Sequence, residues 1–120
     1  MSRTTMALIV KFIMTFLAAW IIFGVMLDNP LSHVLLLSAL GTAINYLLGD
    51  LMVLPKFGNA VASVGDGVMA ALTAYILDML IPVFETTFTA LILFTLAVAA
   101  FEYFFHQYLL KDEKVAPNKD

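Results

Sequence analysis

Long apolar runs alternate with short polar breaks along the whole chain. The runs cover about residues 6–27, 31–54, 60–82 and 88–110. Each is close to the roughly 20 residues that an α-helix needs to cross the hydrocarbon of a bilayer. Within a run the apolar residues are continuous, whereas lipid-facing barrel strands alternate polar and apolar positions. The pattern predicts four membrane-spanning helices that use nearly the entire chain.

Small and polar residues recur within each predicted span at steps of three or four. They are Thr4, Ala7, Lys11, Thr15 and Ala18 in the first span, Ser38, Gly41, Asn45 and Gly49 in the second, Ser63, Asp66, Ala70 and Thr73 in the third, and Thr95, Ala99, Glu102 and His106 in the fourth. This spacing keeps residues on one helix face, and small residues let helices approach closely. The fold class predicted is therefore all-α integral membrane, an antiparallel four-helix transmembrane bundle with short loops.

Composition agrees with this fold and limits the chemistry. The chain is 62% hydrophobic and 12% charged, far from the average of soluble domains. We expect one transmembrane domain over residues 1–110 and a charged, solvated tail, KDEKVAPNKD, over residues 111–120. The chain has no cysteine, which excludes disulfides and thiol chemistry.

Basic residues are distributed unevenly over the predicted loops. They are Arg3, Lys11, Lys56, Lys111, Lys114 and Lys119. The other two loops carry Asp28 and Glu85 instead. Because Lys and Arg are enriched in cytoplasmic loops, this distribution predicts that both termini and the Lys56 loop are cytoplasmic. Aromatic residues gathered at the end of the fourth span agree with an interface there, as in the run YFFHQY.

The stretch YLLGDLMVLPKFGN, residues 46–59, joins the second and third spans. Pro55 cannot continue a helix, and the pair Gly58-Asn59 supplies a flexible turn followed by a plausible N-cap of the next span. Lys56 would anchor the turn on the cytoplasmic side. Turn formation therefore accounts for most polar residues of this stretch, but not for Asp50.

Six residues form a candidate buried polar layer near the cytoplasmic side. Helix rise places Lys11, Asn45, Asp66 and Glu102 roughly 8 to 12 Å from that boundary, with Asp50 and His106 just below them. Three carboxylates would then face one permanent cation. Carboxylates left without a cation in an apolar environment tend to bind protons.

Simpler interpretations exist for these residues. Lys11 could extend its ammonium to the headgroups, and Asp50 could be an interfacial residue at a span end. Asp66 lies deeper, beside Gly65 and Gly67, and we favour a specific role for it that includes pairing with Lys11.

The polar residues near the opposite surface and at the end of the fourth span give weaker indications of a functional site. We expect Asp78 and His33 to face water. Glu102 and His106 are spaced i, i+4 and could bind a cation, but one such pair is a weak motif. No metal or cofactor is predicted.

The run INYLLGDLMVLPKFGNAVASVGDG, residues 44–67, is similar to the signature of the YndM-like family, small four-span membrane proteins of spore-forming Gram-positive bacteria. The run ALIVKFIMTFLAAWIIFG of the first span also fits that family. The resemblance implies a multi-pass protein of the bacterial cytoplasmic membrane. It implies no activity, substrate or catalytic residue.

Three function classes are compatible with the sequence. We favour a non-enzymatic membrane protein that acts through association with itself, a partner protein or lipid. The alternative is a minimal, oligomeric, proton-coupled transporter or ion channel that uses its buried carboxylates. An intramembrane enzyme is disfavoured, because no nucleophile and base occur at a recognisable spacing.

Overall fold

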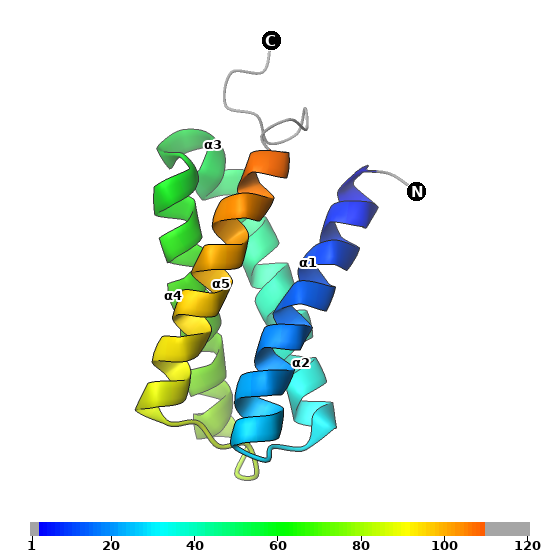
Figure 1. The fold of residues 1–120 in the computed structure, drawn as a ribbon, viewed down its shortest axis with the longest axis vertical. Coiled ribbons are helices and arrows are strands. Elements are labelled where there is room, and N and C mark those ends of the chain that lie inside the picture. Colours follow the sequence, from blue (N-terminus) through cyan, green and yellow to red (C-terminus); the bar gives the residue numbers. More distant parts are fainter. Residues whose placement is uncertain (1–2, 110–120) are drawn as a thin grey trace.

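The computed structural model describes residues 3–109, except for the side chains of Arg3, His106, Tyr108 and Leu109. The described chain is all-helical, and four long apolar helices pack against one another in alternating directions (Figure 1). The stretches long and apolar enough to cross a membrane are Thr4–Met26, Leu31–Phe57, Asn59–Leu80 and Phe88–Phe105. The predicted four-span helical fold is confirmed, while the tail over residues 111–120 lies outside the described residues.

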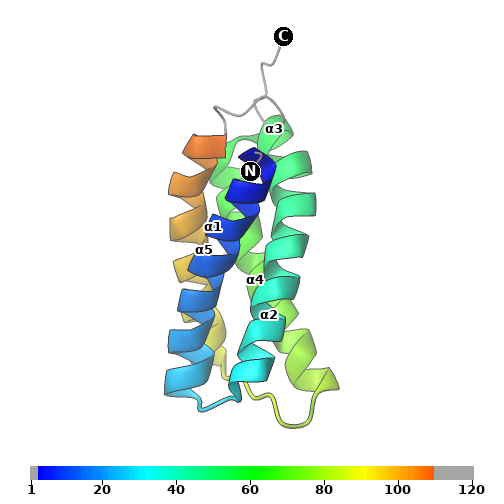
Figure 2. The same cartoon turned by 90° about the vertical axis from the view of Figure 1, so that its right-hand side faces the viewer.

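The helical elements follow one another in a simple order. The first span consists of α1 (Arg3–Ala19) and the π-helical η1 (Trp20–Met26). The second consists of α2 (Leu31–Ile44), the π-helical η2 (Asn45–Val53) and the short α3 (Leu54–Phe57). The third is α4 (Asn59–Leu80) and the fourth is α5 (Phe88–Leu109). Figures 1 and 2 show that α3 lies at the same end of the bundle as the start of α1 and the end of α5.

The turn between the second and third spans differs from its prediction at two residues. Pro55 lies inside the helical segment, in the first turn of α3, and Gly58 makes the turn with φ of 88°. The prediction that Pro55 ends the helix was wrong, because proline is tolerated in a first helical turn and η2 supplies a wider turn just before it. Asn59 is the first residue of α4 and not its N-cap, which is Gly58. Its amide instead donates to the Tyr103 carbonyl at 2.8 Å, which joins α4 to the end of α5.

Two loops close the opposite end of the bundle, and one side chain joins them. The Asn29 amide donates to the carbonyls of Phe23 at 2.9 Å and Glu85 at 2.8 Å, and its oxygen accepts from the Glu85 backbone N–H at 2.7 Å. Asp78 accepts from the backbone N–H and the hydroxyl of Thr86 at 2.9 and 2.7 Å. These bonds give hydrogen-bond partners to backbone groups in the loops, where no helix provides them.

Two apolar clusters fill the interior. The larger lies toward the loop end and includes Phe23, Leu37, Phe84 and Phe94. The smaller lies toward the α3 end and consists of Ala7, Leu54, Ala62 and Phe105. The space between them is filled by charged side chains, which form the candidate site.

Candidate functional site: a buried charge cluster

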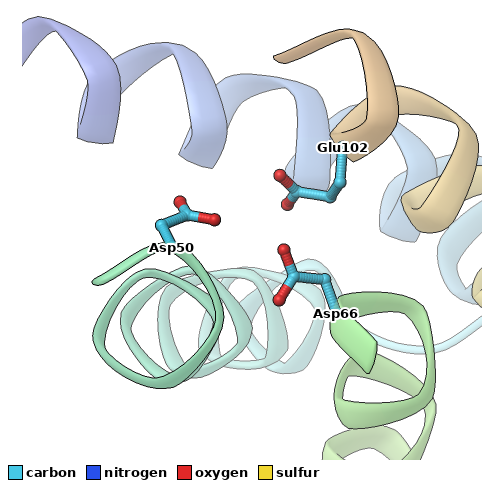
Figure 3. Close-up of side chains that lie close together, drawn as sticks. All are labelled: Asp50, Asp66 and Glu102. Atoms are coloured by element: carbon cyan, nitrogen blue, oxygen red, sulfur yellow. The ribbon is translucent and has the colours of Figure 1, made fainter. Parts of the chain in front are cut away.

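Each of the four spans contributes one charged side chain to a single buried cluster. Lys11 Nζ of α1 lies 2.5 Å from Glu102 Oε2 of α5, 3.0 Å from Asp50 Oδ2 of η2 and 3.8 Å from Asp66 Oδ2 of α4. All four side chains are 0% exposed. Figure 3 shows the three carboxylates, from three different elements, turned toward one another. We call these four residues the charge cluster.

The smaller apolar cluster covers the charge cluster on the side of α3. Its members lie one helical turn from the charged residues: Ala7 four before Lys11, Leu54 four after Asp50, Ala62 four before Asp66, and Phe105 three after Glu102. Residues at these spacings stack on one helix face. The Phe105 ring centroid also lies 5.3 Å from Lys11 Nζ, within the range of a cation–π contact. Apolar side chains therefore separate the charges from the nearer end of the bundle.

The π-helical segment η2 explains how Asp50 reaches the cluster. Its i→i+5 bonding widens the helical turn, so residues five apart lie nearly above one another. Asn45 and Asp50, which ordinary helical spacing would place on different faces, both belong to the buried side of η2. A Cβ atom at Gly49 would overlap with the Asp66 carboxylate, so glycine leaves the space that Asp66 occupies. Sequence reasoning missed this segment, since its apolar residues fit an α-helix equally well.

A second polar layer lies one turn from the charge cluster, toward the loop end. Thr15 follows Lys11 by four residues, and Asn45 precedes Asp50 by five. Asn45 is 0% exposed, and Thr15 and Thr42 are also buried. Within the described part of the chain, the Thr15 and Thr42 hydroxyls and both polar atoms of the Asn45 amide have no hydrogen-bond partner. Such orphaned groups are rare in native interiors.

The six residues of the predicted polar layer fall into three groups. Lys11, Asp50, Asp66 and Glu102 meet in the charge cluster, Asn45 lies in the adjacent layer, and the His106 side chain lies outside the described residues. Lys11 does not extend to the surface of the bundle and Asp50 is not exposed at its span end, because both are fully buried. The pairing of Lys11 with Asp66 is the longest of its three contacts. His33 and Asp78, expected to face water, are half-buried.

The geometry of the charge cluster is compatible with the binding of a cation. One oxygen from each carboxylate of the cluster lies within 4.8 Å of the other two. Oxygen ligands at such spacing suit hard cations, and here the Lys11 ammonium occupies a cation's position. Whether His106 joins Glu102 in holding a cation, as its spacing allows, lies outside the described side chains.

Two apolar grooves mark the outer surface of the bundle. A groove of about 430 Å³ lies between α1 and α2 and is lined by Thr5, Leu8, Ile9, Phe12, Ala39, Thr42 and Ala43. A groove of about 510 Å³ follows α3 and α4 and is lined by Val53, Phe57, Val61, Gly65, Val68 and Met69. Neither is lined by a member of the charge cluster.

Fold and site together define a multi-pass membrane protein with charges buried among its spans. The chain belongs to the family described as protein of unknown function (DUF2512), which matches residues 2–119. It is similar to the uncharacterized membrane protein YndM of Bacillus subtilis (strain 168), with 38% identity over 71 residues. That alignment covers 58% of this chain and 39% of YndM, so the chain matches well under two thirds of its relative. No solved structure matches the chain.

Proposed function

We propose that this protein is a non-enzymatic membrane protein of the bacterial envelope that acts through association within the bilayer, first of all with a second copy of itself. The observation that carries the proposal is the complete enclosure of the charge cluster, whose four side chains are 0% exposed within one chain. An enzyme needs its reactive groups to meet a substrate. Side chains that contact one another inside the bundle instead hold four helices in one arrangement.

The outer surface supports association. The groove along α3 and α4 is bordered by Phe57, Val61 and Val68, each between 45% and 64% exposed. Gly65 lies in this groove with no atom within 4 Å of where its Cβ would be. A small residue on a lipid-facing helix lets a partner helix approach closely, which is how membrane helices gain packing energy. A two-fold pair would bring the same groove of both copies together. A partner protein or lipid could occupy the same groove.

Cross-linking tests self-association directly, because the chain has no cysteine of its own. A Gly65→Cys variant in lipid vesicles is expected to form disulfide-linked dimers under mild oxidation. The matched control is Ile13→Cys, which is 48% exposed on α1 and lies outside both grooves, and it is expected to stay monomeric. Failure of Gly65→Cys to cross-link above the control, with no energy transfer between labelled copies, would reject self-association.

A second candidate function, a minimal proton-coupled transporter or channel, is favoured by one specific observation. Three carboxylates surround one ammonium, whereas one carboxylate would suffice for a structural pair. Intramembrane ionisable residues often belong to proton or ion pathways. A pH-dependent dye response in vesicles, lost in Asp66→Asn while the protein stays folded, is the result that would replace association with transport.

Orientation in the bacterial cytoplasmic membrane belongs to the same proposal. Lys56 lies at the end of the bundle where α1 begins and α5 ends, and the loops with Asp28 and Glu85 lie at the other end (Figure 1). The distribution of basic residues supports a cytoplasmic location for the Lys56 end.

A further inference from the structure

Two threonines of the second polar layer differ from other hydroxyl residues of the helices in their hydrogen bonding. The hydroxyls of Ser38, Thr73 and Thr95 each donate to the carbonyl four residues earlier in their own helix, at 2.8 Å. Any serine or threonine inside a helix has such a carbonyl within reach. Thr15 and Thr42 also lie inside helices, but among the described residues their hydroxyls have no partner. Both hydroxyls are therefore available to a ligand.

Asn45 limits what this ligand can be. Its side chain is 0% exposed, and both polar atoms of its amide have no hydrogen-bond partner in the described part of the chain. On α5 this level lies about one turn before Glu102, where the side chains are described. The amide nitrogen donates and the amide oxygen accepts, so one kind of ligand suits both atoms only if it also accepts and donates. A metal cation would satisfy the oxygen alone, whereas water or a hydroxyl compound satisfies both.

Gly41 provides the space that such a ligand needs. It is buried, and Thr42 and Asn45 follow it by one and four residues. Apart from its chain neighbours and the backbone of its own helix, a Cβ atom at Gly41 would meet one atom within 4 Å, the Thr15 methyl carbon at 3.9 Å. Close-packed interiors leave few spaces of this size. A methyl group fits beside Gly41, and so does a water molecule, which is of similar size.

The enclosure of the layer favours water over larger hydroxyl compounds. Thr15 and Thr42 are 2% and 6% exposed, and their hydroxyl oxygens are buried. We infer that Thr15, Thr42 and Asn45 form a binding site for ordered water inside the bundle, beside Gly41. Buried water makes about three hydrogen bonds, so one or two molecules satisfy the polar atoms of the site. Water here extends the polar interior by one helical turn from the charge cluster toward the loop end.

Selective isotope labelling of asparagine tests this site by nuclear magnetic resonance. The sequence has four asparagines, so the side-chain amide signals are few, and Asn45→Gln identifies the signal of Asn45. In nanodiscs of phosphatidylcholine, whose headgroup has no hydroxyl, the Asn45 amide protons are expected to show a nuclear Overhauser effect from water. A rotating-frame measurement separates this direct contact from chemical exchange. Gly41→Ala should abolish the effect, because the added methyl group occupies the space. Thr42→Val should reduce it at least by half, because the water loses one of its partners.

Thr73→Val is the matched control. Thr73 is 8% exposed, close to the value for Thr42, but its hydroxyl bonds within its own helix, so the water signal at Asn45 should not change. Circular dichroism verifies that each variant is folded, and the wild-type signal decides the question if Gly41→Ala does not fold.

Absence of the effect in folded wild-type protein would overturn the inference, and so would its full persistence in folded Gly41→Ala. An effect that appears only after phosphatidylglycerol is added would also overturn it, because a lipid hydroxyl would then be the ligand. The inference does not rest on self-association: cross-linking at Gly65, on the outer surface, can fail while the water signal at Asn45 persists.

Discussion

At the scale of single residues, Lys11 is the residue whose environment is most unusual. A lysine near the end of a span normally extends its ammonium to the headgroups, since its four methylenes tolerate hydrocarbon. Here the ammonium is enclosed by Glu102, Asp50 and Asp66 and lies 5.3 Å from the centre of the Phe105 ring. Each helix of the bundle is thereby linked to α1 by an ionic contact. Loss of the ammonium would affect the contacts of all four helices together.

We predict that Lys11→Met lowers the free energy of unfolding by about 3 kcal/mol, the lower end of the range for breaking a buried ion pair. Adding Glu102→Gln should restore part of the loss, since it removes the carboxylate nearest to Lys11. Denaturant unfolding in detergent micelles measures both effects.

The control for this prediction is Lys56→Met, which removes an exposed lysine from α3 and should change stability by no more than about 0.5 kcal/mol. Wild-type stability of Lys11→Met would show that the ionic contacts do not hold the bundle together. A double variant less stable than Lys11→Met alone would show that the loss does not come from the Glu102 carboxylate that Lys11 contacts.

At the scale of the elements, two features position the cluster. The π-helical turn of η2 brings Asp50 to the buried side, and the close packing of α4 against α5 brings Asp66 near Glu102. Gly67, next to Asp66, makes that packing possible. A Cβ at Gly67 would lie 2.5 Å from the Thr95 carbonyl oxygen, which is backbone and cannot move without the helix. The stripe of small residues predicted from the sequence thus has a physical role at this contact.

Two neighbouring glycines of α4 provide a matched pair of substitutions. Gly67→Ala should destabilise the protein by about 1 to 3 kcal/mol, the usual cost of overpacking. Gly65→Ala should be neutral or stabilising by up to about 1 kcal/mol, since its Cβ meets open space and alanine favours helix. Thermal unfolding in a monomeric detergent state compares the two. Equal melting temperatures for both variants would contradict the close packing of α4 and α5 at Gly67.

At the scale of the whole molecule, the fold was predictable and the composition of the site was only partly so. Apolar run length and three-to-four spacing predicted four helices and their inward faces, because a bilayer accepts few other backbone structures. Helix rise predicted one depth for Lys11, Asn45, Asp66 and Glu102; in the structure Lys11 contacts Asp66 and Glu102, whereas Asn45 lies in the adjacent layer. It misplaced Asp50, because single-residue spacing assumes an α-helix throughout and η2 is not one. The contact of Lys11 with three carboxylates could not be predicted from the sequence, because the spacing of residues along one helix does not give the distances between residues on different helices.

Orientation in the membrane is the last property that the whole molecule determines. The start of α1, the Lys56 corner and the end of α5 share one end of the bundle, and the loops over residues 27–30 and 81–87 share the other (Figure 2). The positive-inside rule therefore predicts the same side of the membrane for all the segments at one end of the bundle. Reporter fusions after residue 120 and within the Lys56 loop should be active only as cytoplasmic reporters, and fusions at Asp28 or Glu85 only as extracytoplasmic ones. Replacing Lys56 by Gln should leave this pattern unchanged, because Arg3 and the basic tail remain. A cytoplasmic signal at Asp28 together with an extracytoplasmic one after residue 120 would mean that the bundle is inserted the other way, with the charge cluster near the outer surface.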